Sequence, residues 1–365
     1  MKKNNSKQNG KEASGSNSRA GSKGLTIGID LGDKRSRYCV LDAAGKVIEE
    51  GSVANTRESL GKHFGGLGRA RIALETGTQS GWISRELEAL GHEVLVANAR
   101  ELRAIWGSGR KNDRRDAEKL ARYARVDPAI LRPVRVRGAQ AQGDLSRIRA
   151  RDAVVRARVL LVNAARGLAK SQGQRLAPGG TATWGQRSGA LLSGELVQAL
   201  QPLLEQIDAL GQQILRYDRE IAAQAAERYP ETAVLRTTPS VGALTALSFV
   251  LTLEDPRRFR RSREVGSYLG LCPRQAQSGE HDPQLRISKQ GDEYLRRLLV
   301  QCAHRTLGPF GQDTALRRWG LALAERGGKN AAKRAIVAVA RKLAVLLHRL
   351  WVSQRPYQAF PQKAT

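Results

Sequence analysis

Four acidic residues have the spacing and the surroundings that divalent-metal chemistry requires. Asp30 lies in the apolar run LTIGIDL, and Glu75 ends a second apolar run, IALE. Asp113 and Asp116 lie three residues apart at the start of a helical pattern, so they share one face of that helix. A carboxylate among apolar residues is costly to bury unless a positive charge lies against it. We therefore interpret these four residues as ligands for two Mg²⁺ ions that act on a phosphodiester.

Parts of this set also have simpler interpretations. Acids at the start of a helix are stabilised by the helix dipole without any metal. A strand such as residues 28–33 also opens actin-type ATPase folds, but these need a second phosphate loop and a Gly-rich adenosine site, and we find neither in the sequence. The occurrence of acids on two strands and one helix therefore favours the metal site.

The elements around the four acids predict an α/β domain, residues 24–135, of the RNase H-like (RuvC-like) type. Three meandering strands come first and are followed by alternating helix and strand, which is the order typical of that fold. The last helix begins near residue 112 and has Leu120, Tyr123 and Ala124 on its core side. The predicted strands are residues 25–31, 38–41, 47–53, 71–75 and 93–97, and the predicted helices before the last are residues 56–64 and 84–90.

Residues 136–233 predict a helical coiled-coil region. The first helix lies in a segment, residues 132–175, where basic residues greatly outnumber acids, so we expect an arginine-covered outer face. After a break rich in Gly, Ser and Pro, apolar residues recur at alternating steps of four and three, as in a coiled-coil seam. Pro202 marks either a kink or the true start of this second helix. The two helices predict an antiparallel hairpin, although the seam would serve a second protomer equally well. The seam consists of Leu196, Leu200, Leu203, Ile207, Leu210, Ile214, Tyr217 and Ile221.

Residues 234–352 predict a mainly α-helical C-terminal domain. The sequence TPSVG followed by residues 243–253 has the character of a helix-hairpin-helix motif, whose backbone amides approach phosphate without sequence preference. A basic cluster at residues 256–263 follows. The domain continues through the segment ISKQG into an apolar helix, and a last amphipathic, basic helix covers residues 333–351.

Ser288 in the segment ISKQG has two interpretations. As a nucleophile it would need activation by Lys289, by Arg296 or by metal bound at the acidic site. As a structural residue it would cap the helix that runs through Leu295. Ser278 is a second candidate for the nucleophile because it lies in a polar Ser-Gly loop.

Composition indicates the class of partner. The chain has 365 residues, with 62 Lys and Arg against 34 Asp and Glu, a net charge of +28, so phosphate of nucleic acid is the expected counter-ion. No long uncharged apolar run and no secretory leader is present, and three scattered cysteines form no metal-ligand spacing. We expect a bacterial cytoplasmic protein without membrane contact. Residues 1–23 predict a disordered basic tail, and residues 353–365 a C-terminal tail.

The acidic set and the later motifs resemble one known family. Asp30, Glu75, Asp113 and Asp116, with KNDRRDA, are similar to the DEDD set of insertion-sequence transposases related to the Piv pilin-gene invertases. The stretches TPSVGALTA, RRFRRSREVGSYLGLCPR, QSG and ISKQGDEYLRRLL resemble the C-terminal domain of that family in the same order. One departure is Ser240, which stands where the family usually has Gly in Pro-Gly-Val-Gly.

This resemblance implies a fold and a function. It implies a RuvC-like domain, a coiled-coil excursion and a serine transposase domain in which Ser288 is the nucleophile. It further implies Mg²⁺-dependent DNA recombination with donor and target DNA, guided by a structured non-coding bridge RNA, in a dimer or tetramer. The alternative is a metal-dependent, structure-selective RuvC-like nuclease, which would need the four acids and would have no use for Ser288.

Overall fold

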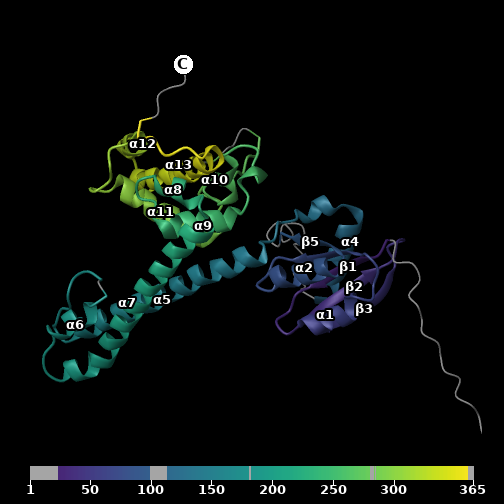
Figure 1. Ribbon diagram of the computed structural model, residues 1–365, viewed down its shortest axis with the longest axis horizontal. Helices are drawn as coiled ribbons and strands as arrows, with labels where there is room; N and C mark the ends of the chain where they lie inside the picture. The colour runs from purple at the N-terminus through teal and green to yellow at the C-terminus, as the bar shows by residue number, and fades with distance from the viewer. Residues whose placement is uncertain (1–23, 99–112, 181, 280–282, 284, 361–365) are drawn as a thin grey trace, which may run out of the picture. The chain divides into compact units, whose positions relative to one another are not determined.

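The computed structural model describes residues 24–98, 113–180, 182–279, 283 and 285–360. The predicted tail at residues 1–23 and the last five residues of the predicted C-terminal tail lie outside this description. The chain divides into two compact units, Met1–Arg137 and Gly138–Thr365 (Figure 1). Each unit is described by itself below.

The first unit is built on a mixed five-stranded sheet of order β3-β2-β1-β4-β5. β1 pairs with β2 in antiparallel orientation and with β4 in parallel orientation, and β5 extends the parallel side. All five strands were predicted, and the strand order agrees with the RNase H-like prediction. β2 begins three residues before the predicted strand. The prediction missed these residues because Arg35 and Arg37 are charged and exposed and so give no apolar signal. The strands are β1 Thr26–Asp30, β2 Arg35–Leu41, β3 Val47–Ala54, β4 Arg71–Glu75 and β5 Glu93–Ala97.

The two faces of the sheet are covered in different ways. On one face, large aliphatic side chains such as Ile29 and Leu74 pack against α1, Arg57–Phe64, and α2, Ser80–Ala89, in the larger core of this unit. On the other face, small residues meet α4, Asp113–Val126, where Leu120 and Ala124 are buried as predicted, Tyr123 is half-buried, and Ala121 is buried as well. α2 begins at Ser80, whereas the predicted helix began at residue 84.

The second unit begins with two long antiparallel helices. These are α5, Ala139–Ser171, and α7, Glu195–Arg228, and the short α6, Trp184–Gly189, lies between them in sequence. Trp184 is fully buried and fills the end of this hairpin together with apolar residues of both long helices. α7 starts upstream of Pro202, which lies inside the helix. Leu200, Ile207 and Ile221 of the predicted seam are buried within the chain itself, so the predicted intramolecular hairpin is the one that forms.

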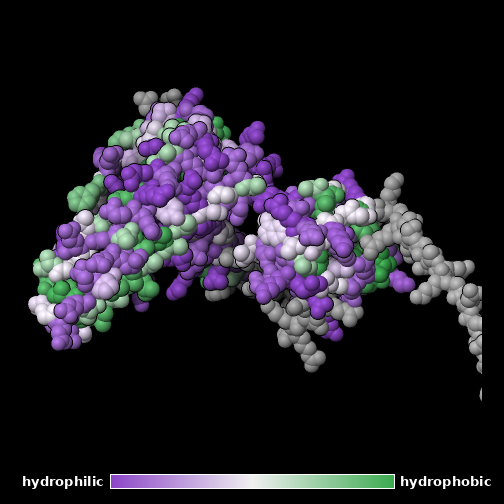
Figure 2. Space-filling view, turned by 60° about the horizontal axis from the view of Figure 1, so that its bottom comes forward, coloured by the Kyte–Doolittle hydropathy of each residue, from purple (hydrophilic) through white to green (hydrophobic). Residues whose placement is uncertain are grey.

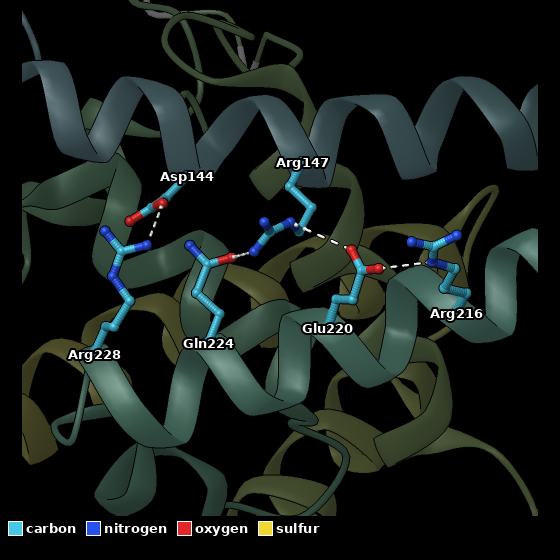
Figure 3. Close-up of polar contacts among 6 residues, drawn as sticks. All are labelled: Asp144, Arg147, Arg216, Glu220, Gln224 and Arg228. Atoms are coloured by element: carbon cyan, nitrogen blue, oxygen red, sulfur yellow. Dashed lines mark hydrogen bonds and ion pairs between the residues drawn. The ribbon is translucent and has the colours of Figure 1, made fainter.

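Several arginines in the first half of α5 form ion pairs and hydrogen bonds as well as contributing to its outer surface. There α7 presents acidic and amide side chains to α5, and the arginines turn toward them (Figure 3). Arg147 contacts Gln224 and Glu220, and Arg151 Nε lies 2.6 Å from Asp218 Oδ1. The side chain of Arg147 remains 41% exposed and that of Arg151 18% exposed, so the pairing covers these two arginines to different extents.

The remaining helices pack around α13, Ala331–Ser353, whose buried residues include Val339, Leu343 and Leu347. α12 was not predicted. The residues after α13 lie against these helices, since Tyr357 N donates to Thr237 Oγ1 at 2.9 Å. No helix in the described part of the chain has the length and apolar character needed to cross a bilayer. The other helices are α8 Thr232–Arg236, α9 Ala243–Leu253, α10 Glu264–Tyr268, α11 Glu293–Leu307 and α12 Ala315–Glu325.

Candidate active site

Asp30 and Glu75 lie at the carboxyl ends of two neighbouring parallel strands. The register pairs Ile29 with Leu74, so Asp30 and Glu75 follow at the same level of the sheet. Ile29 and Leu74 point into the core beneath α1 and α2. Because side chains alternate along a strand, Asp30 and Glu75 point to the opposite face, which α4 covers. The sequence prediction thus identified two acids that the sheet places side by side.

The backbone of α4 touches β1 directly, and this contact brings Asp116 to the same region. A Cβ atom on Gly28 would lie 1.9 Å from Ala117 O and 2.5 Å from Ala121 N, so only glycine fits there. Asp116 directly precedes Ala117, and Gly28 is two residues before Asp30 on the same face of the strand. Asp113 begins α4 one turn earlier, and its side chain lies outside the described residues.

Positive charge accompanies these acids. Lys119 Nζ lies 3.5 Å from Asp116 Oδ1, and Arg37 lies opposite Asp30 in the β1–β2 register. Carboxylate oxygens are the ligands that Mg²⁺ prefers, so the chemistry of the donor set fits this ion. Among the described side chains, no three from His, Cys, Asp and Glu form a group close enough to hold a metal ion. The structure therefore places Asp30 and Glu75 on the same face of the sheet and at the same level along the strands.

Ser288 lies in a loop that hydrogen bonds fix on both sides. Ser288 N donates to Cys272 O at 2.9 Å, and Lys289 N donates to Gly270 O at 3.1 Å. Lys289 and Gly291 both have positive φ, 55° and 71°, and a Cβ on Gly291 would lie 2.1 Å from Tyr268 O. The loop is therefore a tight turn whose backbone conformation is fixed, and it is anchored to the end of α10.

Ser288 does not cap the following helix. The N-cap of α11 is Asp292, whose Oδ1 accepts a hydrogen bond from Leu295 N at 2.8 Å. The contact of Ser288 Oγ with Gln290 N is long, at 3.4 Å. The alternative structural role of Ser288 as the helix cap is therefore wrong. Ser278, the second candidate, is exposed.

Arg296 was predicted as a possible activator of Ser288, and its contacts give it another role. The side chain is buried, and Nη1 donates to Gln290 O at 2.8 Å and to Leu269 O at 3.1 Å. The guanidinium group thus ties the serine loop to the end of α10. Lys289, directly after Ser288, is exposed.

A basic cavity of about 590 Å³ lies beside the serine loop. It adjoins the bridge between Pro273 and Ile287, the residue before Ser288. Two arginines line it, together with polar and apolar residues, which suits an anionic, partly apolar ligand such as a nucleotide unit. The lining residues are Ser267, Cys272, Pro273, Arg274, Gln275, Pro283, Leu285 and Arg341.

Sequence reasoning missed two residues of these sites. Asp292 carries a recognisable signal, because Asp directly before an apolar helical run is an N-cap pattern. Arg37 carries a weaker one, since only the register of the β1–β2 hairpin places it opposite Asp30.

Comparison with known proteins adds two family matches. Residues 27–171 match a transposase family of the DEDD, IS110 type, and residues 232–319 match the family described as Transposase IS116/IS110/IS902. The first match contains all four predicted acids, and the second contains Ser288.

Individual relatives span most of the chain. The transposase for insertion sequence element IS1111A of Coxiella burnetii is 29% identical over 341 residues, 91% of each chain. A probable family 20 transposase of Pseudomonas aeruginosa is 30% identical over 295 residues, 79% of this chain and 85% of the relative. The pilin gene-inverting protein of Moraxella lacunata is 28% identical over 126 residues, 34% of this chain and 38% of the relative.

Proposed function

Because the chain belongs to the IS116/IS110/IS902 family of transposases, we propose that it cuts and rejoins DNA strands with its four carboxylates and Ser288. The predicted resemblance to insertion-sequence transposases and pilin-gene invertases is confirmed at the level of the family. The observation that supports this chemistry best is the placement of Asp30 and Glu75 level with each other, beneath the start of α4.

Asp30, Glu75, Asp113 and Asp116 would hold two Mg²⁺ ions. When bound, such ions orient an attacking oxygen and stabilise charge on the leaving oxygen of a phosphodiester. The sheet register and the contact at Gly28 set the positions of the backbone segments that carry these carboxylates. Lys119 lies near Asp116 and offsets part of the negative charge.

Ser288 would act as the nucleophile. Its Oγ attacks phosphorus and loses its proton, an Oγ–P bond forms, and the P–O bond to the leaving deoxyribose oxygen breaks as that oxygen gains a proton. The resulting phosphoserine ester keeps the energy of the broken bond for rejoining. Exposed Lys289 directly after Ser288 supplies positive charge near the developing oxyanion.

DNA is the substrate in this proposal, and the charge of +28 also suits a structured guide RNA. A homo-oligomer, either a dimer or a tetramer, would use the outer surface of the hairpin. Figure 2 shows apolar residues, coloured green, on that surface at the left of the view. The large exposed apolar side chains of the hairpin region include Val159, Leu160, Leu168, Leu191 and Leu215.

The test is detection of a covalent protein–DNA adduct on denaturing gels, using a nicked substrate in Mg²⁺. We expect the wild type to form the adduct and Ser288→Ala to lose both adduct and recombination. Asp116→Ala should also lose strand cleavage but keep DNA binding, because it removes one metal ligand and leaves the basic surface intact. Ser278→Ala is the matched control and should behave as wild type.

The opposite outcomes are equally clear. Adduct formation by Ser288→Ala would move the nucleophile to Ser278. Cleavage by the wild type with no adduct, surviving in Ser288→Ala, would instead indicate the RuvC-like nuclease. Normal cleavage by Asp116→Ala in Mg²⁺ would overturn the metal site.

A further inference from the structure

An ion pair joins the hairpin to the residue that follows the serine loop. Arg149 of α5 places Nη2 2.5 Å from Asp292 Oδ2, and the two side chains are 41% and 8% exposed. The other oxygen of Asp292 caps α11 by accepting from Leu295 N. The largely buried carboxylate of Asp292 therefore has two roles: one oxygen caps α11, and the other binds Arg149 of α5.

Aromatic contacts reinforce the same junction. Tyr294 in the first turn of α11 is 4% exposed, and the guanidinium carbons of Arg149 and Arg297 lie 5.0 and 4.9 Å from its ring centroid. Arg297 Nη2 in turn lies 2.5 Å from Asp152 Oδ1 on α5. Cation–π contacts contribute most where the groups are desolvated, as at this buried ring. The first turn of α11 is thus held by residues of α5 that include Arg149 and Asp152.

The chain leading into this turn is the serine loop itself. Asp292 follows Gly291, and Ser288 is four residues before it. Bonds to Gly270 and Cys272 and the side chain of Arg296 also hold the loop, but all of these come from the same stretch of sequence. Arg149 comes from 143 residues away, on the hairpin. The direction in which the loop leaves α11 therefore depends on where α5 lies.

We propose that Arg149 is a positioning residue for Ser288, acting through Asp292. This inference rests on the proposed role of Ser288 as the nucleophile. Attack on phosphorus requires the oxygen to lie in line with the leaving group, and a misplacement of about 1 Å costs on the order of 10²-fold in rate. By binding the free oxygen of the α11 cap, Arg149 makes the position of Ser288 depend on the hairpin as well as on the C-terminal helices.

Two substitutions break this contact from opposite sides. Arg149→Gln removes the cation, and Asp292→Asn removes the anion while keeping a residue that caps helices as well as Asp does. At saturating DNA, we expect each to slow single-turnover adduct formation by roughly 10- to 100-fold. DNA affinity should stay within about twofold of wild type, because no phosphate contact is assigned to this pair. Arg149→Lys keeps the charge and should recover part of the rate.

The matched control is Arg228→Gln. Arg228 pairs with Asp144 between α5 and α7, with side-chain exposures of 42% and 11%, close to those of the Arg149 pair, and it touches no residue of the serine loop. Melting temperatures of all variants show whether loss of stability alone explains a slower reaction. If the pair acts as one unit, Arg149→Gln with Asp292→Asn should be no slower than either single variant.

Equal rates for Arg149→Gln and Arg228→Gln would overturn the inference, and so would additive losses in the double variant. A wild type that forms adduct, with Arg149→Gln forming it at the same rate, overturns this inference alone. A wild type that forms no adduct overturns the proposed nucleophile and this inference with it.

Discussion

At the scale of single residues, Ser240 has a backbone conformation that favours glycine. Its φ is 72°, in the left-handed region. Its Oγ lies 3.3 Å from Thr306 Oγ1, which also donates to Cys302 O at 2.9 Å. The turn before α9 therefore keeps the conformation that glycine would adopt, and serine is strained in it.

Ser240→Gly should therefore raise stability. The left-handed conformation costs a non-Gly residue about 1–2 kcal/mol, and glycine loses about 0.5–1 kcal/mol more backbone entropy on folding, so the expected gain is up to about 1 kcal/mol. Chemical denaturation measures it. Ser240→Ala is the control, because it removes the hydroxyl and keeps the strain; an equal gain in Ser240→Ala would show that strain is not the cause.

At the scale of elements, a ladder of polar contacts sets how α5 and α7 align (Figure 3). Arg147 Nη1 donates to Gln224 Oε1 at 2.8 Å, and its Nε lies 3.5 Å from Glu220 Oε2. Nearby, Tyr229 donates to Asp144 Oδ2, and burial together with this bond raises the pKa of Tyr229 to about 12. Tyr229 consequently remains a protonated donor at alkaline pH values where an ordinary tyrosine ionises.

Arg147→Ala should destabilise the hairpin. Gln224 is only 3% exposed, and its Nε2 already lacks a hydrogen-bond partner, so removing Arg147 leaves the carbonyl of the same amide unpaired. An unsatisfied buried polar group costs about 1–3 kcal/mol. Arg216→Ala, which removes a 78% exposed arginine from the same Glu220, should change stability by less than about 0.5 kcal/mol. Hydrogen exchange of α5 and α7 amides separates the two, and equal effects would contradict the ladder.

Local patterns sufficed to predict most elements, including the two strands that end in Asp30 and Glu75. Strands with apolar alternation were found, and the carboxylates that end two of them were identified from the same runs. α12 was missed because Gly320 interrupts its pattern, and glycine is needed there since a Cβ would lie 2.5 Å from Val339 Cγ2 on α13. The Arg149–Asp292 contact could not be predicted from the sequence, because two residues 143 positions apart leave no periodic signal.

At the scale of the whole molecule, charge dominates the expected binding. The 62 Lys and Arg residues include arginines that pair with acids in the hairpin, such as Arg151 and Arg228, and those pairs contribute nothing to the net charge of +28. Exposed basic residues remain along the chain, including Arg260, Arg261 and Arg263. We therefore expect nucleic acid to be bound by charge distributed over exposed side chains.

Affinity for duplex DNA and for structured RNA should fall steeply with salt. Each phosphate neutralised on duplex DNA contributes a slope of about −0.9 to log K against log salt concentration. Fluorescence anisotropy between low and moderate salt, without Mg²⁺, measures this slope for wild type and for Asp116→Ala, which should agree. An affinity that is constant across this range would contradict binding through phosphate.

The contact between Gly28 and the backbone of α4 has a consequence for redesigning this protein. The spacing of α4 from β1 is set where Ala117 O and Ala121 N meet a residue without a side chain. The aliphatic layer on the other face, beneath α1 and α2, does not enter that contact. Thermostable variants can therefore be sought by repacking Ile27, Ile29, Ile72 and Leu74 while the separation of the acid-bearing backbones stays as it is. In a mutant library, the face of the sheet beneath α1 and α2 can be varied, and the face that contacts α4 must be kept constant.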